Sequence, residues 1–311
     1  MRTTLIVLVL LAIASLPIVT VAAGEKQPSL VLRHFVTLPT GLGAEGLVIH
    51  EGHFYVGTFS FTATDGTILV YDKDGTLGQR FTVSGLPQVG QLVFTDDETL
   101  VAVAGNLASG KGSVVKVNLE TGKITTFASG FKLPNGIVVD TDGNFFVTDL
   151  VAGSVSKITP NGTVSTLASG GLLAPALIPG AGLTLGSNDL VFNEKQTTLY
   201  VTNVGQNIVI KVTIGKDGKA DAITKFASIP GPDGIALDNK GLLYVTSPFT
   251  NSVYTITSNG STQKLSIDTT NEPFNNPSNL AFHGRQLYIT NLAISGTGSI
   301  TVVTVQPADD D

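Results

Sequence analysis

The feature that most constrains this chain is a unit of about 45 residues that recurs along most of its length. Leu133–Gly170 shows the unit most clearly, because it holds four short apolar or alternating runs separated by turn sequences. The runs are Ile137–Asp140, Phe145–Asp149, Ser154–Thr159 and Thr163–Leu167. A four-stranded meander this short cannot bury both of its faces, so it needs copies of itself to stack against.

The copies are found by aligning the residue that precedes the first apolar run of each unit. These residues, which we call the anchor ring, are Glu45, Gly90, Asn135, Asn188, Asp233 and Ser278, and they open units one to six. They are separated by 45, 45, 53, 45 and 45 residues. Six copies in so regular a register predict an all-β fold, a six-bladed β-propeller of four-stranded blades, rather than a sandwich.

The last unit is one strand short. It offers runs near Leu280–Phe282, Gln286–Thr290 and Ser299–Val305 before the chain ends. Ser29–Thr37 is similar to the outer runs of other units, so we expect it to form the outer strand of the sixth blade. This pairing would close the ring and remove an open sheet edge. Residues 24–311 are therefore predicted to form a single propeller domain, and we expect a monomer.

The N-terminal segment Met1–Ala23 has one basic residue, a long apolar run and small residues at its end. This pattern predicts a secretory signal peptide and a secreted or periplasmic protein, with no stable membrane insertion after cleavage. An uncleaved membrane anchor is the alternative, because the run is nearly long enough to span a bilayer. The chain has no cysteine, which excludes disulfides and thiol chemistry. Its formal charge of −6 argues against nucleic-acid binding.

Three connections depart from the short turns found elsewhere. The 53-residue interval places eight extra residues within the apolar, Gly- and Pro-rich stretch Gly171–Gly186. Phe59–Gly66 and Gly105–Gly112 are expected as longer loops between second and third strands. In a propeller all three emerge on one face, which we call the mouth. They form either a lid over a small-molecule pocket or loops that pack on their own blades.

The anchor ring carries the chemistry that the sequence suggests. Its six positions lie beside the central channel at the mouth, and they include two carboxylates and two carboxamides. Converging oxygens of this kind suit a Ca²⁺-like cation. Turn preference alone would also favour Asn, Asp and Gly here, although not Glu. Spacing by itself leaves a metal site and a set of turn residues equally open.

These motifs resemble the senescence-marker-protein (SMP-30)/gluconolactonase/luciferin-regenerating-enzyme family and, more distantly, the paraoxonase-type lactonases. The matching motifs are Glu45-Gly46, Asn135, Ser187-Asn188 and Pro232-Asp233-Gly234, in the blade order of that family. The resemblance implies that Glu45, Asn135, Asn188 and Asp233 bind a divalent metal ion, with Ca²⁺ expected and Zn²⁺ or Mn²⁺ as alternatives. The sequence departs from the family at Leu133, where gluconolactonases carry Arg, and Lys132 is the nearest candidate substrate contact.

A second ring lies at the ends of the second strands, and we call it the strand-end ring. Its members are Thr58, Ala104, Asp149, Asn203, Ser247 and Asn291. The polar members are candidates for substrate binding, and Asp149, as the ionisable one, is a second candidate for a general base. The alternative is that these side chains cap strand ends.

Two functions from different classes follow from these residues. As an enzyme, the protein would be a metal-dependent hydrolase of a small-molecule lactone or ester, with Asp233 or Asp149 transferring the proton. As a binding module, it would be a non-enzymatic propeller of the NHL-repeat type that holds a protein or a small ligand at the mouth.

Overall fold

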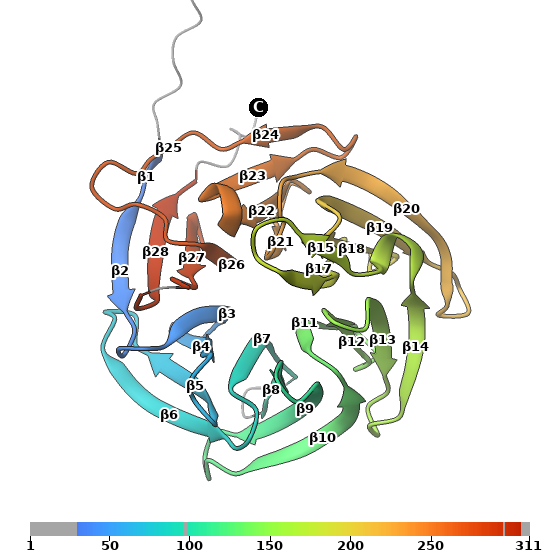
Figure 1. The fold of residues 1–311 in the computed structure, drawn as a ribbon, viewed down its shortest axis with the longest axis horizontal. Coiled ribbons are helices and arrows are strands. Elements are labelled where there is room, and N and C mark those ends of the chain that lie inside the picture. The colour runs from blue at the N-terminus through green and yellow to red at the C-terminus, as the bar shows by residue number, and fades with distance from the viewer. Residues whose placement is uncertain (1–29, 96–98, 295, 306–311) are drawn as a thin grey trace, which may run out of the picture.

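The computed structural model describes residues 30–95, 99–294 and 296–305. Within these ranges the chain forms strands arranged around a central axis, which confirms an all-β, propeller-like fold (Figure 1). The helices in these described ranges are two 3-10 turns, η1 (Gly171–Leu173) and η2 (Pro248–Thr250). No helix in the described part is long and apolar enough to cross a membrane. The predicted signal segment Met1–Ala23 lies outside the described residues.

Units three to five each form an antiparallel four-stranded sheet in sequence order. Unit three consists of β11 (Pro134–Val139), β12 (Phe145–Asp149), β13 (Ser154–Ile158) and β14 (Val164–Ser169). Unit four consists of β17 (Ser187–Phe192), β18 (Thr198–Asn203), β19 (Ile208–Ile214) and β20 (Ala220–Ser228). Unit five consists of β21 (Ile235–Leu237), β22 (Leu243–Ser247), β23 (Ser252–Ile256) and β24 (Thr262–Lys264). The four strand positions predicted for unit three are therefore correct to within a few residues.

Units one and two share a sheet because of one bridge between Phe59 and Gln88. Unit one consists of β3 (Gly43–His50), β4 (His53–Phe59), β5 (Gly66–Tyr71) and β6 (Leu77–Val83). Unit two consists of β7 (Gln88–Phe94), β8 (Thr99–Asn106), β9 (Lys111–Asn118) and β10 (Ile124–Phe131). The predicted long loop Gly105–Gly112 is shorter than expected, because β8 and β9 extend the ladder to a pair between Asn106 and Lys111.

The two ends of the described chain meet in one sheet. β2 (Arg33–Thr37) pairs with β28 (Ser299–Thr304), which is followed by β27 (Gln286–Asn291) and β26 (Pro277–His283). The residues before β2 take a different partner, since β1 (Leu30–Val31) pairs in parallel with β25 (Ile267–Asp268). The segment predicted as one outer strand is therefore two short strands, and Ser29 lies outside the described residues.

Turn chemistry in unit three shows why the strands reverse where they do. The Asp140 side chain accepts hydrogen bonds from the backbone N–H groups of Asp142 and Asn144, at 3.0 and 2.8 Å. Gly143 adopts a φ of 77°, which glycine reaches without the steric cost that other residues incur. The reversal brings Phe145 opposite Val139, so both strands present apolar residues to the neighbouring units.

The hydrophobic core lies between neighbouring units rather than within them. One buried cluster joins Phe146 and Val155 of unit three to Leu190, Leu199 and Ile210 of unit four. Other clusters join unit one to unit two and unit six to unit one. Each unit therefore buries its faces only when its neighbours are present, as the repeat predicts.

Candidate functional site

Bulges in the inner strands position the anchor ring. In unit one the register shifts between Ala44 and Leu47, so Glu45 and Gly46 together face a single residue of the neighbouring strand. Units two, three, four and six have the same shift at their anchor residues. A bulge changes the direction of the side chains it carries. Here the bulge carries the anchor residue.

The four predicted metal ligands form two hydrogen-bonded pairs. Asn135 Nδ2 donates to Glu45 Oε1 at 3.1 Å, and Asn188 Nδ2 donates to Asp233 Oδ1 at 2.7 Å. Glu45, Asn188 and Asp233 are buried, and Asn135 is partly buried. Residues from units one, three, four and five therefore converge in the way that the spacing predicts.

Burial makes this cluster electrostatically unfavourable when it has no counter-charge. Burial raises the pKa of Glu45 to about 7. It also raises the pKa of Asp233 well above its usual value, and the charges of Glu45 and Asp189 raise it further. Within the cluster, Glu45 Oε2 and Asn188 Oδ1 are buried oxygens without a hydrogen-bond partner. Such atoms are rare in folded proteins, and their desolvation is costly unless a cation or a donor compensates for it.

Asp189 is a buried carboxylate next to the ring that the sequence analysis missed. It occupies the position that is glycine in units one, three and five, namely Gly46, Gly136 and Gly234. Its Oδ2 accepts from Ile235 N–H at 3.1 Å and from Asn279 Nδ2 at 3.2 Å. Burial raises the pKa of Asp189 to about 7. The break in the glycine pattern was a visible signal for this residue.

A series of buried threonines holds the backbone of the ring, and the sequence analysis did not identify it. Each hydroxyl donates to the carbonyl of the anchor residue in the next unit. The pairs are Thr148 with Asn188, Thr202 with Asp233, Thr246 with Ser278 and Thr290 with Glu45. Three of the four carbonyls held in this way belong to predicted metal ligands. The recurring Val/Ile-Thr pair before each strand end was the signal.

The polar side chains of the strand-end ring form hydrogen bonds to other parts of the protein. Asp149 accepts from four backbone N–H groups, those of Lys132, Leu133, Val151 and Ala152. The other polar members bond as follows: Thr58 to Thr67, Asn203 to Leu172, Ala174 and Gln206, Ser247 to Pro230 and Thr250, and Asn291 to Asn275, Ile289 and Thr301. These contacts match the strand-capping alternative, and the predicted substrate contacts stay predictions.

The extra residues of the fourth interval form a short hairpin over the mouth. β15 (Ala176–Ile178) pairs with β16 (Leu183–Leu185), and η1 precedes them. The Asn203 side chain holds this segment through the carbonyls of Leu172 and Ala174, each within 3.0 Å. Ile178 packs in an apolar cluster with Leu133, Leu150 and Val204. The position that carries Arg in gluconolactonases is therefore part of an apolar wall here, and the neighbouring Lys132 is exposed.

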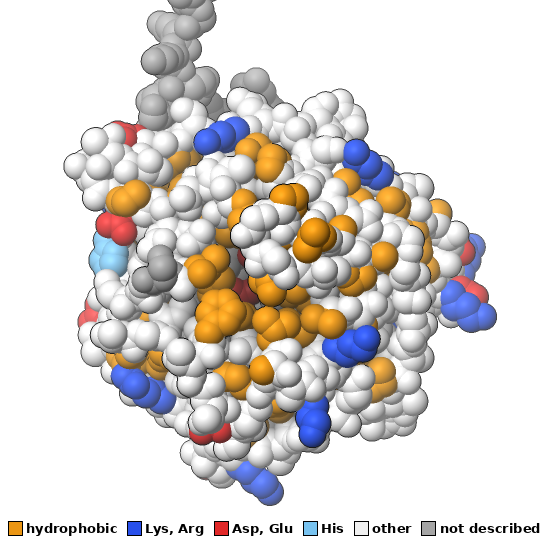
Figure 2. Space-filling model, viewed as in Figure 1, with side chains coloured by type: hydrophobic (Ala, Val, Ile, Leu, Met, Phe, Trp, Pro, Cys, Tyr) orange, Lys and Arg blue, Asp and Glu red, His pale blue; other side chains and the backbone are white. Residues whose placement is uncertain are grey.

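A hollow opens at the centre of the mouth. Figure 2 shows carboxylate atoms at the bottom of this hollow and hydrophobic side chains around it. Beside it, between units one and six, lies a cavity of about 320 Å³ lined by Gly43, Phe59, Phe61, Leu292 and Ile294 among others. Its lining residue Gly43 is the first residue of β3, the strand that carries Glu45.

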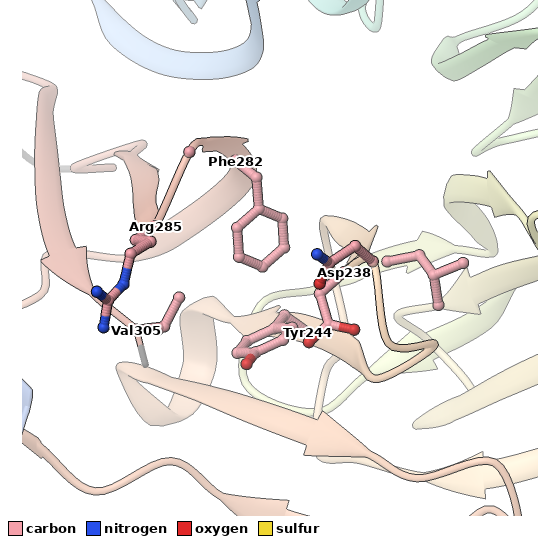
Figure 3. A pocket seen from close by; sticks show the side chains of 8 residues that line it. Asp238, Tyr244, Phe282, Arg285 and Val305 are labelled. Atoms are coloured by element: carbon pink, nitrogen blue, oxygen red, sulfur yellow. The ribbon is translucent and has the colours of Figure 1, made fainter. Parts of the chain in front are cut away.

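A separate cavity of about 340 Å³ lies between units five and six, at the turns that follow β21 and β26. These turns are on the face opposite the mouth. Tyr244 and Phe282 pack edge to face inside it, at 5.1 Å between ring centroids. Figure 3 shows Arg285 and Asp238 on opposite sides of the Phe282 ring. None of the anchor-ring residues lines this cavity.

A known family model covers most of the chain. The sequence profile described as SMP-30/Gluconolactonase/LRE-like region matches residues 44–293. No curated protein sequence matches the chain.

Several solved structures share the fold at low sequence identity. A gluconolactonase from Xanthomonas campestris is 18% identical, with a TM-score of 0.65 over 89% of this chain and 90% of that one. An auxiliary nutrient binding protein from Bacteroides thetaiotaomicron is 13% identical, with a TM-score of 0.66 over 90% and 79%. A virginiamycin B lyase from Staphylococcus aureus is 16% identical, with a TM-score of 0.58 over 89% and 100%. At such identities the similarity shows the fold alone.

Proposed function

Because the chain belongs to the SMP-30/gluconolactonase/LRE-like family, we propose that it is a divalent-cation-dependent hydrolase of a lactone or ester. The active site is the anchor ring at the mouth. The observation that carries this proposal is the pair of buried, unpartnered oxygens, Glu45 Oε2 and Asn188 Oδ1, in a cluster of buried carboxyl groups. A bound cation would satisfy both oxygens and offset the charge of Glu45 and Asp233.

The donor set determines which cation fits. Among the described residues, no three Asp, Glu, His or Cys side chains gather closely enough to hold a metal ion by themselves. The carboxamides of Asn135 and Asn188 are therefore needed beside Glu45 and Asp233. An all-oxygen set of carboxylates and amides is typical of Ca²⁺, with Mn²⁺ next, whereas Zn²⁺ usually takes nitrogen or sulfur ligands.

A cation bound at this site would supply Lewis-acid polarisation of a carbonyl oxygen. Hydrolysis forms a bond between the oxygen of a water molecule and the carbonyl carbon, and it breaks the bond from that carbon to the alkoxy oxygen. In our proposal the Asp233 carboxylate accepts one proton from the water and returns it to the alkoxy oxygen, which leaves as the hydroxyl group of the product. Asn188 Nδ2 holds the carboxylate in place at 2.7 Å. We assign this role to Asp233 rather than Asp149, whose oxygens already accept four backbone hydrogen bonds.

Metal titration combined with an activity screen tests the proposal. The chelated protein is titrated with Ca²⁺, Mn²⁺ or Zn²⁺ by calorimetry, and hydrolysis of lactones and aryl esters is followed with and without chelator. We expect one ion per chain and a stability gain of about 3 kcal/mol at a hundredfold excess over Kd. We also expect hydrolysis that chelator abolishes. Hydrolysis that chelator leaves unchanged would contradict the proposal, and metal binding without turnover would favour the NHL-type binding module.

We also infer that the six units close into a six-bladed ring. Thr290 donates to the Glu45 carbonyl and Ser278 Oγ donates to the Ala44 carbonyl at 2.7 Å, so unit six contacts unit one at the channel. The β2–β28 pairing would complete the ring. Deleting residues 30–37 should then expose the edge of β28 and cause aggregation. A truncated protein that stays monomeric and equally stable would contradict closure.

We propose export for this protein on the basis of Met1–Ala23 alone. Expression of the full chain in a bacterial host, followed by N-terminal sequencing of the periplasmic fraction, tests it. We expect a mature N-terminus near Gly24. Full-length protein that fractionates with membranes would favour the uncleaved anchor.

A further inference from the structure

The polar side chains of the strand-end ring already form hydrogen bonds within the protein. Asp149, Asn203, Ser247 and Asn291 each bond to loop backbone, and Thr58 bonds to both the N–H and the C=O of Thr67. A polyhydroxylated substrate such as a sugar lactone needs several free donors and acceptors, because each buried hydroxyl without a partner is costly. This mouth offers few of them around its central carboxylates.

Apolar side chains instead surround the hollow. Four large hydrophobic residues are at least half exposed on mouth segments: Phe61 at 59%, Leu177 at 63%, Phe249 at 50% and Ile294 at 51%. They come from the β4–β5 loop, β15, η2 and the β27–β28 loop, and thus from four different units or connections. Figure 2 shows hydrophobic side chains gathered around the central hollow. Exposed apolar side chains gathered around a hollow in this way favour a binding site.

The cavity between units one and six lies beneath part of this apolar surface, because Phe61 and Ile294 line it. Phe59 and Phe61 form one wall, with ring centroids 4.8 Å apart in an edge-to-face arrangement. Leu292 and Ile294 contribute further apolar lining, and Gly41, Gly43 and Gly296 present only backbone. Ser60 and Thr62 add two hydroxyl groups, whose oxygens lie 3.5 Å apart, within hydrogen-bond distance of each other. A Cβ on Gly43 would lie 2.4 Å from the carbonyl oxygen of Leu292, so units one and six pack backbone against backbone beside this cavity.

The cavity lies close to the anchor ring along β3, although no anchor-ring residue lines it. Gly43 lines the cavity and Glu45 is two residues further along the same strand, a rise of about 7 Å. A molecule with its carbonyl group beside Glu45 could therefore extend an attached chain or ring of that length into the cavity. On the other side of the hollow, Leu133 and Ile178 belong to a second apolar wall.

We propose that the substrate is a lactone or ester with an alkyl chain or aromatic ring, and that this apolar part binds in the cavity lined by Phe59, Phe61, Leu292 and Ile294. This inference rests on the proposed hydrolase function, and it names the substrate class for that same site. The replacement of the family's Arg by Leu133 agrees with it, because an apolar wall does not recognise sugar hydroxyl groups.

A chain-length series tests the inference. We would measure kcat/KM for γ-lactones whose side chain grows from methyl to heptyl, beside D-glucono-1,5-lactone. Each buried methylene should raise kcat/KM about fourfold, equivalent to about 0.8 kcal/mol, until the cavity is full. The sugar lactone should be turned over more slowly than the heptyl lactone. Hydrolysis that is independent of chain length, or faster for the sugar lactone, would overturn the inference and leave the hydrolase proposal intact.

Matched variants locate the effect. Ile294→Ser at the cavity should flatten the dependence of kcat/KM on chain length. Ile223→Ser is the control and should not change this dependence. Ile223 is also exposed, at 38%, but it lies on the outer strand β20, away from the mouth. Phe61→Ser should lower kcat/KM roughly tenfold for the heptyl lactone and less than about twofold for the methyl lactone. Equal effects of the two Ile variants would contradict the assignment of this cavity.

A binding measurement separates this inference from the hydrolase proposal. 3-Alkylcyclopentanones have the ring and carbonyl of a γ-lactone but no ester bond, so they bind without turnover. Their affinity, measured by calorimetry, should rise with alkyl length in the wild type and less steeply in Phe61→Ser. If these ketones bind in this way and no lactone is hydrolysed, the cavity assignment is supported and the hydrolase proposal fails. If no ketone binds, the cavity assignment is wrong.

Discussion

The junctions between units are built in two different ways. At four junctions, from unit three to four, four to five, five to six and six to one, a buried threonine donates to the carbonyl of the next anchor residue. The contact from Thr202 to the Asp233 carbonyl, at 2.6 Å, is an example. The equivalent residues of units one and two are Gly57 and Val103, which have no hydroxyl group. A Cβ on Gly57 would lie 2.4 Å from the carbonyl oxygen of Gly90, so there the backbones pack in direct contact.

This difference matches the distribution of the predicted ligands in part. Glu45, Asn188 and Asp233 have carbonyls held by threonine, and the anchor residue behind the glycine junction is Gly90, which has no side chain. The fourth predicted ligand, Asn135, follows the Val103 junction and has no such bond, and Ser278 is held by Thr246 although it is not a predicted ligand. A hydrogen bond to the backbone carbonyl holds in place the main chain from which a ligand side chain extends toward a cation. Close packing is sufficient at the Gly57 junction, where the next anchor residue, Gly90, is not a ligand. We infer that the threonines behind Glu45, Asn188 and Asp233 position these three ligands.

The largest effect is expected at the glycine junction. Gly57→Ala places a methyl group against two carbonyl oxygens, at 2.4 and 2.6 Å, which backbone movement alone can relieve. We expect a loss of about 3 kcal/mol or more in the free energy of unfolding, measured with denaturant. Gly78→Ala is the control, because its nearest neighbour would lie at 3.6 Å, an ordinary contact. Similar stability of the two variants would show that the junction is not tightly packed.

The next effect is a dependence of stability on pH in the chelated protein. The pKa of Glu45 rises from 4.5 to about 7 on folding, so the folded state holds the proton more tightly than the unfolded state. Stability should therefore fall as pH rises from 4.5 to about 7 and remain low above that, by about 3 kcal/mol for this group. Glu45→Gln should lose part of this dependence and melt at a higher temperature than the chelated wild type at pH 8. Chelated wild type that is most stable at pH 8 would refute it.

Asp233→Asn tests the charge of a threonine-held ligand. Loss of an outer contact to a metal ligand typically weakens affinity by ten- to a hundredfold, so loss of a charged ligand oxygen should weaken Ca²⁺ binding by at least about a hundredfold. Calorimetry measures this change. Asp217→Asn, an exposed turn residue, provides the control and should bind normally. An unchanged Kd in Asp233→Asn would place the cation elsewhere.

The smallest effects come from exchanging the two kinds of junction. Thr202→Val keeps the shape but removes the bonds to the Asp233 carbonyl and from the Asp189 N–H, at 2.6 and 2.9 Å. We expect a loss of about 1 to 3 kcal/mol and weaker cation binding. Val103→Thr, at the matching position of unit two, should change stability by less than about 1 kcal/mol and leave cation binding unchanged. Equal effects of the two variants on cation affinity would contradict a positioning role for the threonines.

Much of the site could be predicted because its residues are spaced by the repeat. The interval of 45 residues identified Glu45, Asn135, Asn188 and Asp233 as neighbours although they are far apart in the chain. The two hydrogen-bonded pairs, Asn135 with Glu45 and Asn188 with Asp233, show that they converge. Equivalent positions of stacked copies must lie around one axis, so the register alone was sufficient.

Asp189 and the threonine series left signals in the repeat that the sequence analysis did not use, whereas the hydrogen bonds of the strand-end ring could not be predicted in this way. Asp149 carries a carboxylate at a suitable register, but four backbone N–H groups from the loops on either side occupy it. The identity of a side chain does not reveal which backbone groups will surround it. A bulge of one residue also places Asn188 and Asp189 together opposite Thr202, and both side chains then contact unit five, at Asp233 and at the Ile235 N–H.

The sequence by itself determined the repeat, the all-β propeller-like fold and the membership of the anchor ring, because each depends on a period that local patterning encodes. The tertiary structure alone decided which polar groups remain available. Hydrogen-bond partners come from other units, as when Thr290 meets Glu45 across 245 positions of the chain. Burial then separates Glu45 Oε2, which has no partner, from the Asp149 carboxylate, which has four. That distinction depends on contacts between units, and no stretch of sequence contains them.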